Sequence, residues 1–431
     1  MPDGEVRGLR ALWVFAAGGL VAVAVGLSAP AVIEMAVTLG NGLVPYPGKD
    51  LATDYVVGVL WAAAIGVTIL AWPVRRRDKG PLLWIWVVKS MVTLGLMLLY
   101  EYRYGVDPDG SFTNATASDF VWEGLRIGEG TRNIQSLAWL QDHIVPGSYH
   151  ASKVSFSLVG LVGVYIFYRA SVIVLQHEDR RVLYALAFFP TILFWSSILG
   201  KDPVVFFGTA LYVYGVVAWW RFNRLRYLLP MALGITVVVF VRMWLGPILL
   251  LPLGAIVLGR LRGIASRCSF LIVLVSAFLL SLDPMKAAWR IETAQDVLDF
   301  RDYLVTAFQG GGSTLEAPQI TGISDVVIFV PRAIFTMLFR PLGIEMFDPF
   351  GLVVGMENVL LLCFLGLAVK RTYWHELKEP LLIWSIVLIL VWGTAYGLVT
   401  FNLGTAVRYK LQIMPVLLGL VLYLARLRPR A

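Results

Sequence analysis

The sequence predicts an all-α, polytopic membrane protein with amphipathic helices on its outer face and both termini on the cytoplasmic side. Two observations predict this class. Of the 431 residues, 58% are hydrophobic and only 15% are charged, whereas soluble domains carry about 25% charged residues on average. Apolar segments also recur along the chain at the length of roughly 20 residues that a helix needs to cross a bilayer.

About twelve segments meet that length requirement, with an uncertainty of about two. They are expected near 10–28, 55–72, 81–100, 154–175, 183–199, 204–220, 228–245, 247–259, 268–282, 352–369, 381–399 and 411–426. The two segments within 228–259 are short, and they could instead form a hairpin or a partly re-entrant element. The first segment lies between two arginines and "SAPA" at 28–31, which mimics a signal peptide. We expect it to be kept as the first helix.

The connections between these segments alternate in charge. With the N-terminus inside, the inner connections hold most Lys and Arg, and the outer connections are acidic on balance. Because cytoplasmic loops of membrane proteins are enriched in Lys and Arg, the alternation predicts the direction of the chain. The net charge of +8 is then mainly a topology signal, and we expect no nucleic-acid partner. The two cysteines, Cys268 and Cys363, lie in separate apolar segments, which argues against a disulfide framework or a metal site.

We expect a single membrane domain over residues 1–431, in which the outer connection 100–153 is unusually long. Loops of such length are usually functional or disordered. Asp107 and Asp109 follow the aromatic end of a span in "YEYRYGVDPDG". "DPDG" is also a strong turn sequence, so a plain surface turn is the alternative to a functional carboxylate pair. Residues 119–145 are spaced like one or two amphipathic helices lying on the membrane surface.

The outer connection 283–351 is also long. Within it, 288–325 begins with apolar residues at helical spacing and continues into three glycines, Gly310 to Gly312. We interpret this segment as an amphipathic lid with a hinge, and a helix resting on the membrane is the alternative. The following apolar stretch contains Pro331 and Arg332, which favours a re-entrant or interfacial element over a spanning helix.

Charged residues collect beside the outer ends of the apolar segments. They are Asp107, Asp109, Lys201, Asp202, Arg242, Arg340, Glu345, Asp348, Arg408 and Lys410. Lys89 lies near the middle of its span, where a charge is costly and suggests either function or a buried structural contact. Arginines bind phosphate through two parallel hydrogen bonds, and carboxylates can act as general bases. The outer face is therefore the expected functional site.

From residue 81 to about 260, the order of these features resembles the GT-C superfamily of polytopic glycosyltransferases, which use polyprenyl-phosphate sugars. The resemblance is carried by the outer carboxylates, the amphipathic segment, "YRASV", "FFPTILFWSSILGKD" and the arginine of "VVVFVRMWLGP". Two spans precede this part. The C-terminal sequences "LFRPLGIEMFDPFG" and "NLGTAVRY" resemble proteins of bacterial polysaccharide clusters.

The resemblance implies a multi-pass glycosyltransferase of the bacterial cytoplasmic membrane that serves cell-envelope or extracellular polysaccharide assembly. Its partners would be a polyprenyl-phosphate carrier, a saccharide acceptor and membrane lipid. Asp109, supported by Asp107, would act as the general base. A divalent metal, Mg²⁺ or Mn²⁺, would bridge carboxylate and phosphate if one takes part. The substrate-binding residues would be Lys201, Asp202, Arg242, Arg340, Arg408 and Lys410.

Three other functions remain open at this point. A polymerase of lipid-linked oligosaccharide units would depend on the outer arginines rather than on a carboxylate pair. A transporter or flippase usually shows internal repeats and broken helices. A non-catalytic subunit of a membrane assembly is the third.

Overall fold

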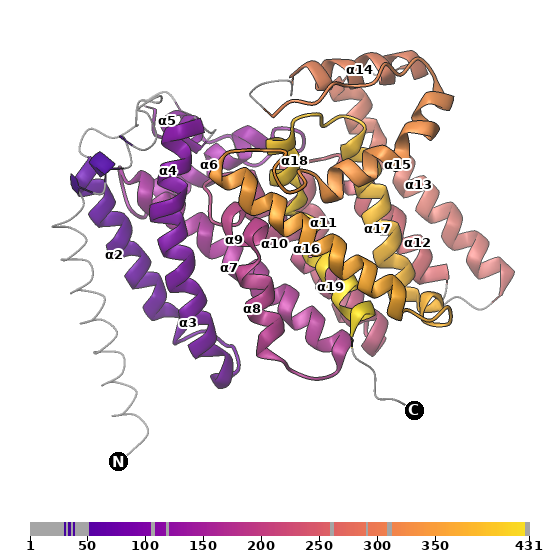
Figure 1. Ribbon diagram of the computed structural model, residues 1–431, viewed down its shortest axis with the longest axis horizontal. Coiled ribbons are helices and arrows are strands. Elements are labelled where there is room, and N and C mark those ends of the chain that lie inside the picture. Colours follow the sequence, from indigo (N-terminus) through magenta and orange to yellow (C-terminus); the bar gives the residue numbers. More distant parts are fainter. Residues whose placement is uncertain are drawn as a thin grey trace. The chain divides into compact units, whose positions relative to one another are not determined.

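The computed structural model contains helices and no strands in the part of the chain that it describes (Figure 1). The described residues are 30–31, 33–35, 38, 51–104, 108–117, 120–258, 263–289, 292–307 and 313–426. Within them, the only bridge outside a helix is an isolated antiparallel pair, Thr314 and Asn402. The predicted all-α class is therefore confirmed for these residues.

The chain divides into two compact units. Unit 1 contains 1–168, 178–189 and 193–210, and unit 2 contains 169–177, 190–192 and 211–431. In unit 1 and at its borders lie α2 (Leu51–Ile69), α3 (Arg76–Met91), the π-helix η1 (Val92–Leu96), α4 (Met97–Tyr104), α5 (Pro108–Thr116), α6 (Gly130–Asp142), α7 (Tyr149–Leu175), α8 (Arg180–Phe188), α9 (Pro190–Trp195) and α10 (Lys201–Phe222). Unit 2 continues with η2 (Leu225–Tyr227), α11 (Leu228–Val241), α12 (Leu245–Leu258), α13 (Ile264–Trp289), α14 (Ala294–Ala307), α15 (Ile323–Phe339), α16 (Pro349–Arg371), η3 (Glu376–Lys378), α17 (Pro380–Gly397), α18 (Leu403–Lys410) and α19 (Met414–Ala425).

Six helical runs among the described residues are long and apolar enough to cross a membrane. They are Ala52–Ile69, Arg76–Tyr104, Tyr149–Leu175, Lys201–Phe222, Pro349–Arg371 and Pro380–Gly397. The pair α18 and α19, bent by 71° at its break, would be a seventh span if counted as one. Shorter apolar helices cover Leu225–Val241, Leu245–Leu258 and Ile264–Leu280. The predicted segment 10–28 lies outside the described residues.

The predicted span 183–199 is not one helix. It divides at Phe189, where α8 ends and α9 begins at Pro190. Proline lacks an N–H donor and disfavours helical backbone in the residue before it. Phe189 accordingly has an extended backbone, with φ −61° and ψ 122°. The side chain of Asp179 caps α8 by accepting a hydrogen bond from the Arg181 N–H at 2.8 Å.

The predicted amphipathic segment 119–145 is helical only in its second half, α6. Residues 120–129 form no helix, and Gly124 and Gly128 adopt φ values of +80° and +91° that side-chain-bearing residues rarely reach. The "DPDG" sequence, in contrast, enters a helix, because Pro108 is the first residue of α5. Proline suits that position, since the first helical N–H has no intrahelical partner. Two short helices therefore follow the span that ends at Tyr104.

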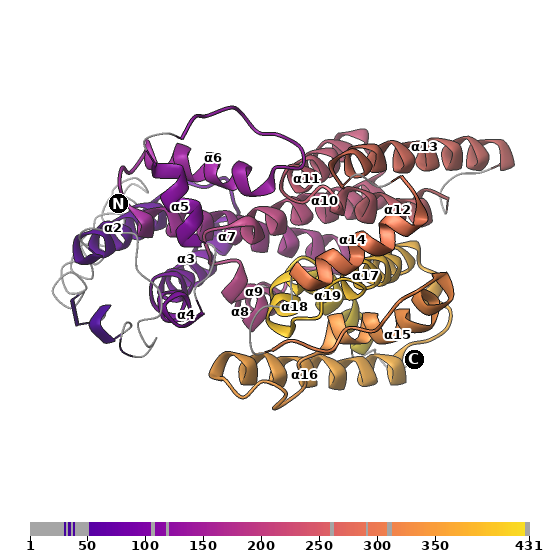
Figure 2. The same cartoon turned by 90° about the horizontal axis from the view of Figure 1, so that it is seen from above.

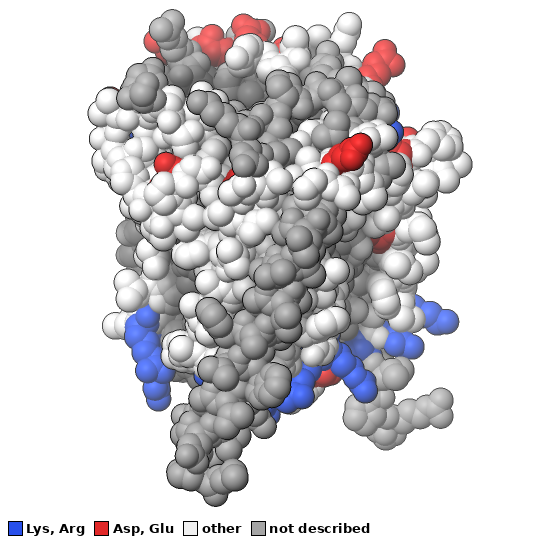
Figure 3. Space-filling model, turned by 90° about the vertical axis from the view of Figure 1, so that its left-hand side faces the viewer, with Lys and Arg blue, Asp and Glu red and all other residues white. Residues whose placement is uncertain are grey.

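Charges gather at opposite ends of the face drawn in Figure 3. Most of the Lys and Arg drawn there lie at its lower end, and Asp and Glu lie mostly towards its upper end. The turn between α2 and α3 is at the lower end (Figure 1), and the exposed arginines 75–77 lie where this turn enters α3. Arg75 and Arg77 both pair with Glu178, which precedes α8.

Buried ionic groups join the helices of unit 1. Asp54 of α2 accepts a hydrogen bond from the Ser148 hydroxyl at 2.5 Å and further bonds from the backbone at Tyr149 and His150. It therefore satisfies donors at the start of α7, which a helix cannot pair internally. Lys153 of α7 donates to Glu101 of α4 at 2.7 Å, and both are buried. Pairing offsets the cost of removing these charges from water.

Lys89 of α3 is buried, and its hydrogen-bond partners are neutral. Its Nζ donates to the Ser196 carbonyl (3.0 Å), the Ser196 hydroxyl (2.7 Å) and the Ser197 hydroxyl (2.9 Å). The ammonium group thereby lies at the C-terminal end of α9, where a helix favours positive charge. The sequence left Lys89 open as a functional residue or as a buried structural contact. Its contacts in the described structure correspond to a buried structural contact.

Unit 2 is built around close helix packing. α15 lies so near α17 that a Cβ at Gly397 would come 2.5 Å from the Ala333 carbonyl oxygen, which explains a glycine there. α18 and α19 pack against α15, α16 and α17, as both views show (Figures 1 and 2). Arg371 at the end of α16 donates to the Ala425 carbonyl at the end of α19 (2.6 Å), which joins the two helices at that end.

Candidate functional site

Two of the predicted cations of unit 2, Arg242 and Lys410, lie at the end of α18. Arg242 is the residue after α11, and its side chain is only 3% exposed. Its guanidinium carbon lies 4.3 Å from the centre of the Tyr409 ring, a cation–π contact. Tyr409 also lies against the Tyr396 ring of α17, with 5.0 Å between ring centres. The Tyr396 hydroxyl in turn accepts a hydrogen bond from Trp244 at 2.9 Å.

Lys410 follows Tyr409 and is fully buried. Its Nζ donates to the Asn358 side-chain oxygen of α16 at 2.7 Å and to the Arg340 carbonyl at 3.4 Å. α18 stops at Lys410 and the chain turns by 71° into α19. Discontinuous helices of this kind often line substrate and ion sites in membrane proteins.

Glu357 supplies the negative charge of the same region. It lies beside Asn358 in α16 and interacts electrostatically with Lys410. Its two carboxylate oxygens accept hydrogen bonds from the Thr191 N–H (2.7 Å) and the Thr191 hydroxyl (2.6 Å) at the start of α9. We call Arg242, Glu357, Asn358, Tyr409 and Lys410 the α18 cluster. Its two cations and one carboxylate are buried, and a buried ionic cluster inside membrane helices suggests a functional site.

Arg340 reaches the α18 cluster by its backbone only. Its guanidinium instead donates hydrogen bonds to Glu345, with Nε 3.0 Å from both carboxylate oxygens. Partial burial alone would raise the pKa of the Glu345 carboxyl, but hydrogen bonds from Arg340 and the Leu342 N–H, with the arginine charge, lower it overall. Arg408 lies one turn from the break and is half-buried. A phosphate that bound Arg340 through these same donors would have to replace Glu345.

The other predicted site residues belong to unit 1. Lys201 begins α10 and donates to the Thr131 hydroxyl of α6 at 2.7 Å, and Asp202 beside it is fully buried. Asp109 lies in the first turn of α5, and its side chain is outside the described part. Asp107 also lies outside the described residues. Among the described side chains, no group of three His, Cys, Asp or Glu residues could hold a metal ion.

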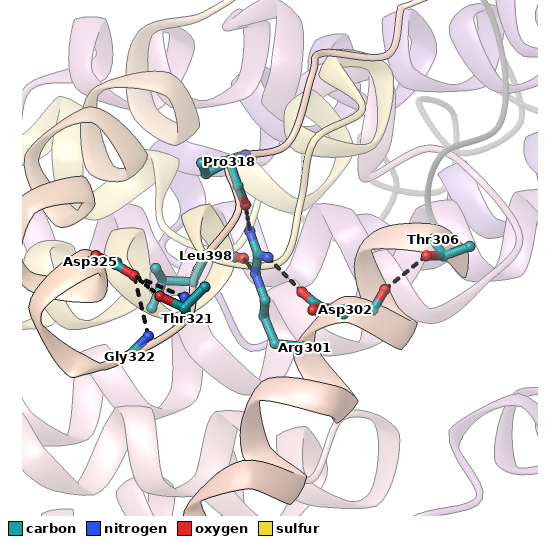
Figure 4. A network of polar contacts seen from close by, with 8 residues as sticks. All are labelled: Arg301, Asp302, Thr306, Pro318, Thr321, Gly322, Asp325 and Leu398. Atoms are coloured by element: carbon teal, nitrogen blue, oxygen red, sulfur yellow. Dashed lines mark hydrogen bonds and ion pairs between the residues drawn. The ribbon is translucent and has the colours of Figure 1, made fainter.

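The predicted lid contains helix α14, although Gly310 to Gly312 lie outside the described residues. Arg301 of α14 joins it to other parts of unit 2 (Figure 4). The guanidinium donates to the Leu398 and Pro318 carbonyls, each at 3.1 Å, and to Asp302 at 2.6 Å. Leu398 is the residue after α17, so α14 is fastened to the turn that leads into α18.

A strap, residues 313–321, holds the beginning of α18. The Leu315 N–H donates to the Phe401 carbonyl at 2.6 Å, and the Leu403 N–H donates to the Ser313 carbonyl at 3.0 Å. Asn402 caps α18, because its side-chain oxygen accepts from the Thr405 N–H at 3.0 Å. At the far end of the strap, hydrogen bonds from the Thr321 backbone N–H and hydroxyl lower the pKa of Asp325 at the start of α15 (Figure 4). The strap therefore positions α18.

Three members of the α18 cluster were absent from the predicted site, Glu357, Asn358 and Tyr409. The pair Glu357–Asn358 interrupts an otherwise apolar span and was the available signal for Asn358. Tyr409 had no such signal, since tyrosines are common near membrane interfaces. No model of a protein family matches this chain, no curated protein is significantly similar to it, and no solved structure matches it.

Proposed function

We propose that this protein is a glycosyltransferase that takes a sugar from a polyprenyl-phosphate carrier at the outer leaflet of the bacterial cytoplasmic membrane. The observation that carries the proposal is the contact of Arg242 with Tyr409 beside Lys410, at the break between α18 and α19. Cations at this break suit a carrier phosphate, and neighbouring aromatic rings suit a sugar. Asp109 belongs to α5, the first helix after the span that ends at Tyr104, and this position supports a role for its carboxylate in the same function.

The reaction assigns a distinct step to each charge. Asp109, with Asp107 in support, removes the proton from the acceptor hydroxyl as general base. The acceptor oxygen then attacks the anomeric carbon, and the bond from that carbon to the carrier phosphate breaks with its electron pair on the phosphate oxygen. Arg242, Arg408 and Lys410 stabilise the negative charge that develops there.

The proposal includes the finer topology. We propose about twelve spans with both termini in the cytoplasm, so that the α18 cluster, Arg340 and the lid helix α14 share the outer side. The separation of basic and acidic ends on the face drawn in Figure 3 supports this direction. The hydrogen bond from Arg301 of α14 to the Leu398 carbonyl supports the proposal that α14 covers the turn before α18.

The test is transfer by the purified full-length protein in lipid vesicles containing a polyprenyl-phosphate sugar. Asp109→Asn keeps the shape and removes the base, so transfer should fall by about 10²–10⁴-fold while carrier binding persists. Arg408→Ala should instead weaken carrier binding. The matched control is Glu123→Gln, an exposed carboxylate after α5, and it should change neither. Wild-type rates in the Asp107→Asn, Asp109→Asn double variant would contradict the carboxylate mechanism.

A repeat-unit polymerase is the second candidate, and the α18 cluster favours it. A polymerase would use outer cations without a carboxylate base, and the α18 cluster holds two buried cations, Arg242 and Lys410, beside the break. In that case the double aspartate variant keeps its activity, while Arg408→Ala loses it.

A further inference from the structure

One face of α15 is exposed and mostly apolar. Its exposed residues recur at helical spacing and are Ser324, Val327, Ile328, Pro331, Arg332 and Phe335. Val327 is 66% exposed and Ile328 is 79% exposed. The opposite face packs against α16, α17 and α18. We call the exposed residues the α15 stripe.

Arg332 places a positive charge in the middle of this stripe. Its guanidinium lies 5.9 Å from the Phe329 ring, a weak contact at the outer limit for cation–π attraction. No hydrogen bond or ion pair joins Arg332 to another residue in the described ranges. Two other arginines described above differ in this respect, because Arg301 pairs with Asp302 and Arg340 pairs with Glu345. Arg332 therefore presents its donors outward.

Neither water nor hydrocarbon alone suits the α15 stripe. In water, exposed side chains such as Ile328 and Phe335 would lose the free energy of apolar burial. In the hydrocarbon core, the uncompensated charge of Arg332 would cost several kcal/mol. The boundary between acyl chains and headgroups satisfies both, because apolar side chains enter the chains while an arginine meets the phosphates.

We propose that the α15 stripe is a lipid site in which Arg332 binds the phosphate of an anionic membrane phospholipid. The guanidinium offers two parallel N–H donors to the phosphate oxygens. The acyl chains lie along Val327, Ile328 and Phe335. An anionic headgroup is required, since the stripe carries one uncompensated positive charge and a zwitterionic headgroup brings no net charge to neutralise it. The site is independent of the α18 cluster and of the function proposed above.

The experiment measures lipid binding to the purified full-length protein by native mass spectrometry. Phosphatidylglycerol and phosphatidylcholine are titrated in detergent micelles. We expect the wild type to retain phosphatidylglycerol in preference, and Arg332→Gln to bind it about fivefold more weakly, the effect of one basic side chain at an anionic surface. Arg332→Lys keeps the charge and should lose less. The control Arg180→Gln removes the same charge from the exposed start of α8 and should leave binding unchanged.

Several results would overturn the proposal. They are unchanged phosphatidylglycerol binding in Arg332→Gln, an equal loss in Arg180→Gln, or equal retention of phosphatidylcholine by the wild type. Displacement of bound phosphatidylglycerol by an equimolar polyprenyl phosphate would assign the stripe to the carrier instead. Displacement by inorganic phosphate would show a bare anion site. If Arg332→Gln fails to fold, Arg332→Lys and the competition experiments on the wild type decide between these outcomes.

Discussion

Lys89 shows what a single buried charge does in this protein. Its ammonium group satisfies three oxygen acceptors of Ser196 and Ser197 after α9. Replacing the side chain by an apolar one of similar length leaves these acceptors without their donor. The interaction is structural because each of its partners is neutral and buried. Its energetic value can be measured directly.

Lys89→Met should therefore lower the free energy of unfolding by about 1–3 kcal/mol for each acceptor left unsatisfied. The measurement is denaturant unfolding in mixed micelles. Lys378→Met is the matched control, because Lys378 is exposed at the end of η3, and it should stay within about 0.5 kcal/mol of the wild type. Adding Ser196→Ala should restore part of the loss. Equal stability of Lys89→Met and the control would contradict this account.

Glu345 and Arg340 form a pair in which the carboxylate occupies the donors that a phosphate would bind with two parallel hydrogen bonds. Glu345→Gln removes the competing carboxylate, so carrier binding should become several times tighter if Arg340 is a phosphate ligand. Isothermal titration with a polyprenyl phosphate measures this. The control is Glu316→Gln on the exposed strap, which should leave affinity unchanged. An unaltered affinity in Glu345→Gln would remove Arg340 from the substrate-binding residues.

The pair also has a defined pH dependence. Because the pKa of Glu345 is lowered in the folded protein, its contribution to stability is fully present above the ordinary glutamate pKa of about 4.3. It is lost as the pH falls through the lowered folded value. The contribution of Glu345 to the free energy of unfolding should therefore stay constant between neutral pH and about pH 5. The free energies of unfolding of the wild type and of Glu345→Gln should converge only in stronger acid.

At the scale of elements, Arg301 decides how firmly α14 holds the turn before α18. Arg301→Met removes the hydrogen bonds to the Leu398 and Pro318 carbonyls and keeps most of the apolar packing. Amide hydrogen exchange should accelerate in the strap 313–321 and at 401–404, while α16 keeps its protection.

Asp302→Asn is the control for Arg301. It removes the charge of an exposed partner, whose ion pair is worth about 0–1 kcal/mol, and leaves the two carbonyl bonds in place. Its exchange pattern should match the wild type. If Arg301→Met also matches the wild type, α14 does not position the beginning of α18.

Local chemistry made much of the element map predictable. Apolar length located α7, α10, α16 and α17, and Pro190 contained the signal for the division of 183–199, although length alone suggested one span. Contacts at long sequence separation could not be read from the chain. Tyr409 meets Arg242 only because α11 and α18 end side by side. Periodicity specifies which face of a helix is apolar, whereas the partner of that face depends on tertiary packing.

At the scale of the whole molecule, the charge asymmetry predicts which connections are cytoplasmic. The test uses a chain in which Cys268 and Cys363, both exposed, are replaced by serine. Single cysteines are then introduced at His177, before α8, and at Asp302 in α14. A membrane-impermeant maleimide should label Asp302→Cys from outside intact cells and His177→Cys only after permeabilisation. Labelling of both from one side would contradict the proposed topology.

The two ends of α9 have a consequence for the order of synthesis. Thr191, near the start of α9, bonds to Glu357, which is synthesised 166 residues later. Ser196, after the end of α9, bonds to Lys89, which is synthesised earlier. At about 5–20 residues per second, the ribosome needs roughly 8–33 s to supply that carboxylate. The nascent chain must therefore hold the start of α9 in the membrane without its final partner. A stalled chain ending before Glu357 should be cleaved near Phe189 by a quality-control protease that spares the released, full-length protein.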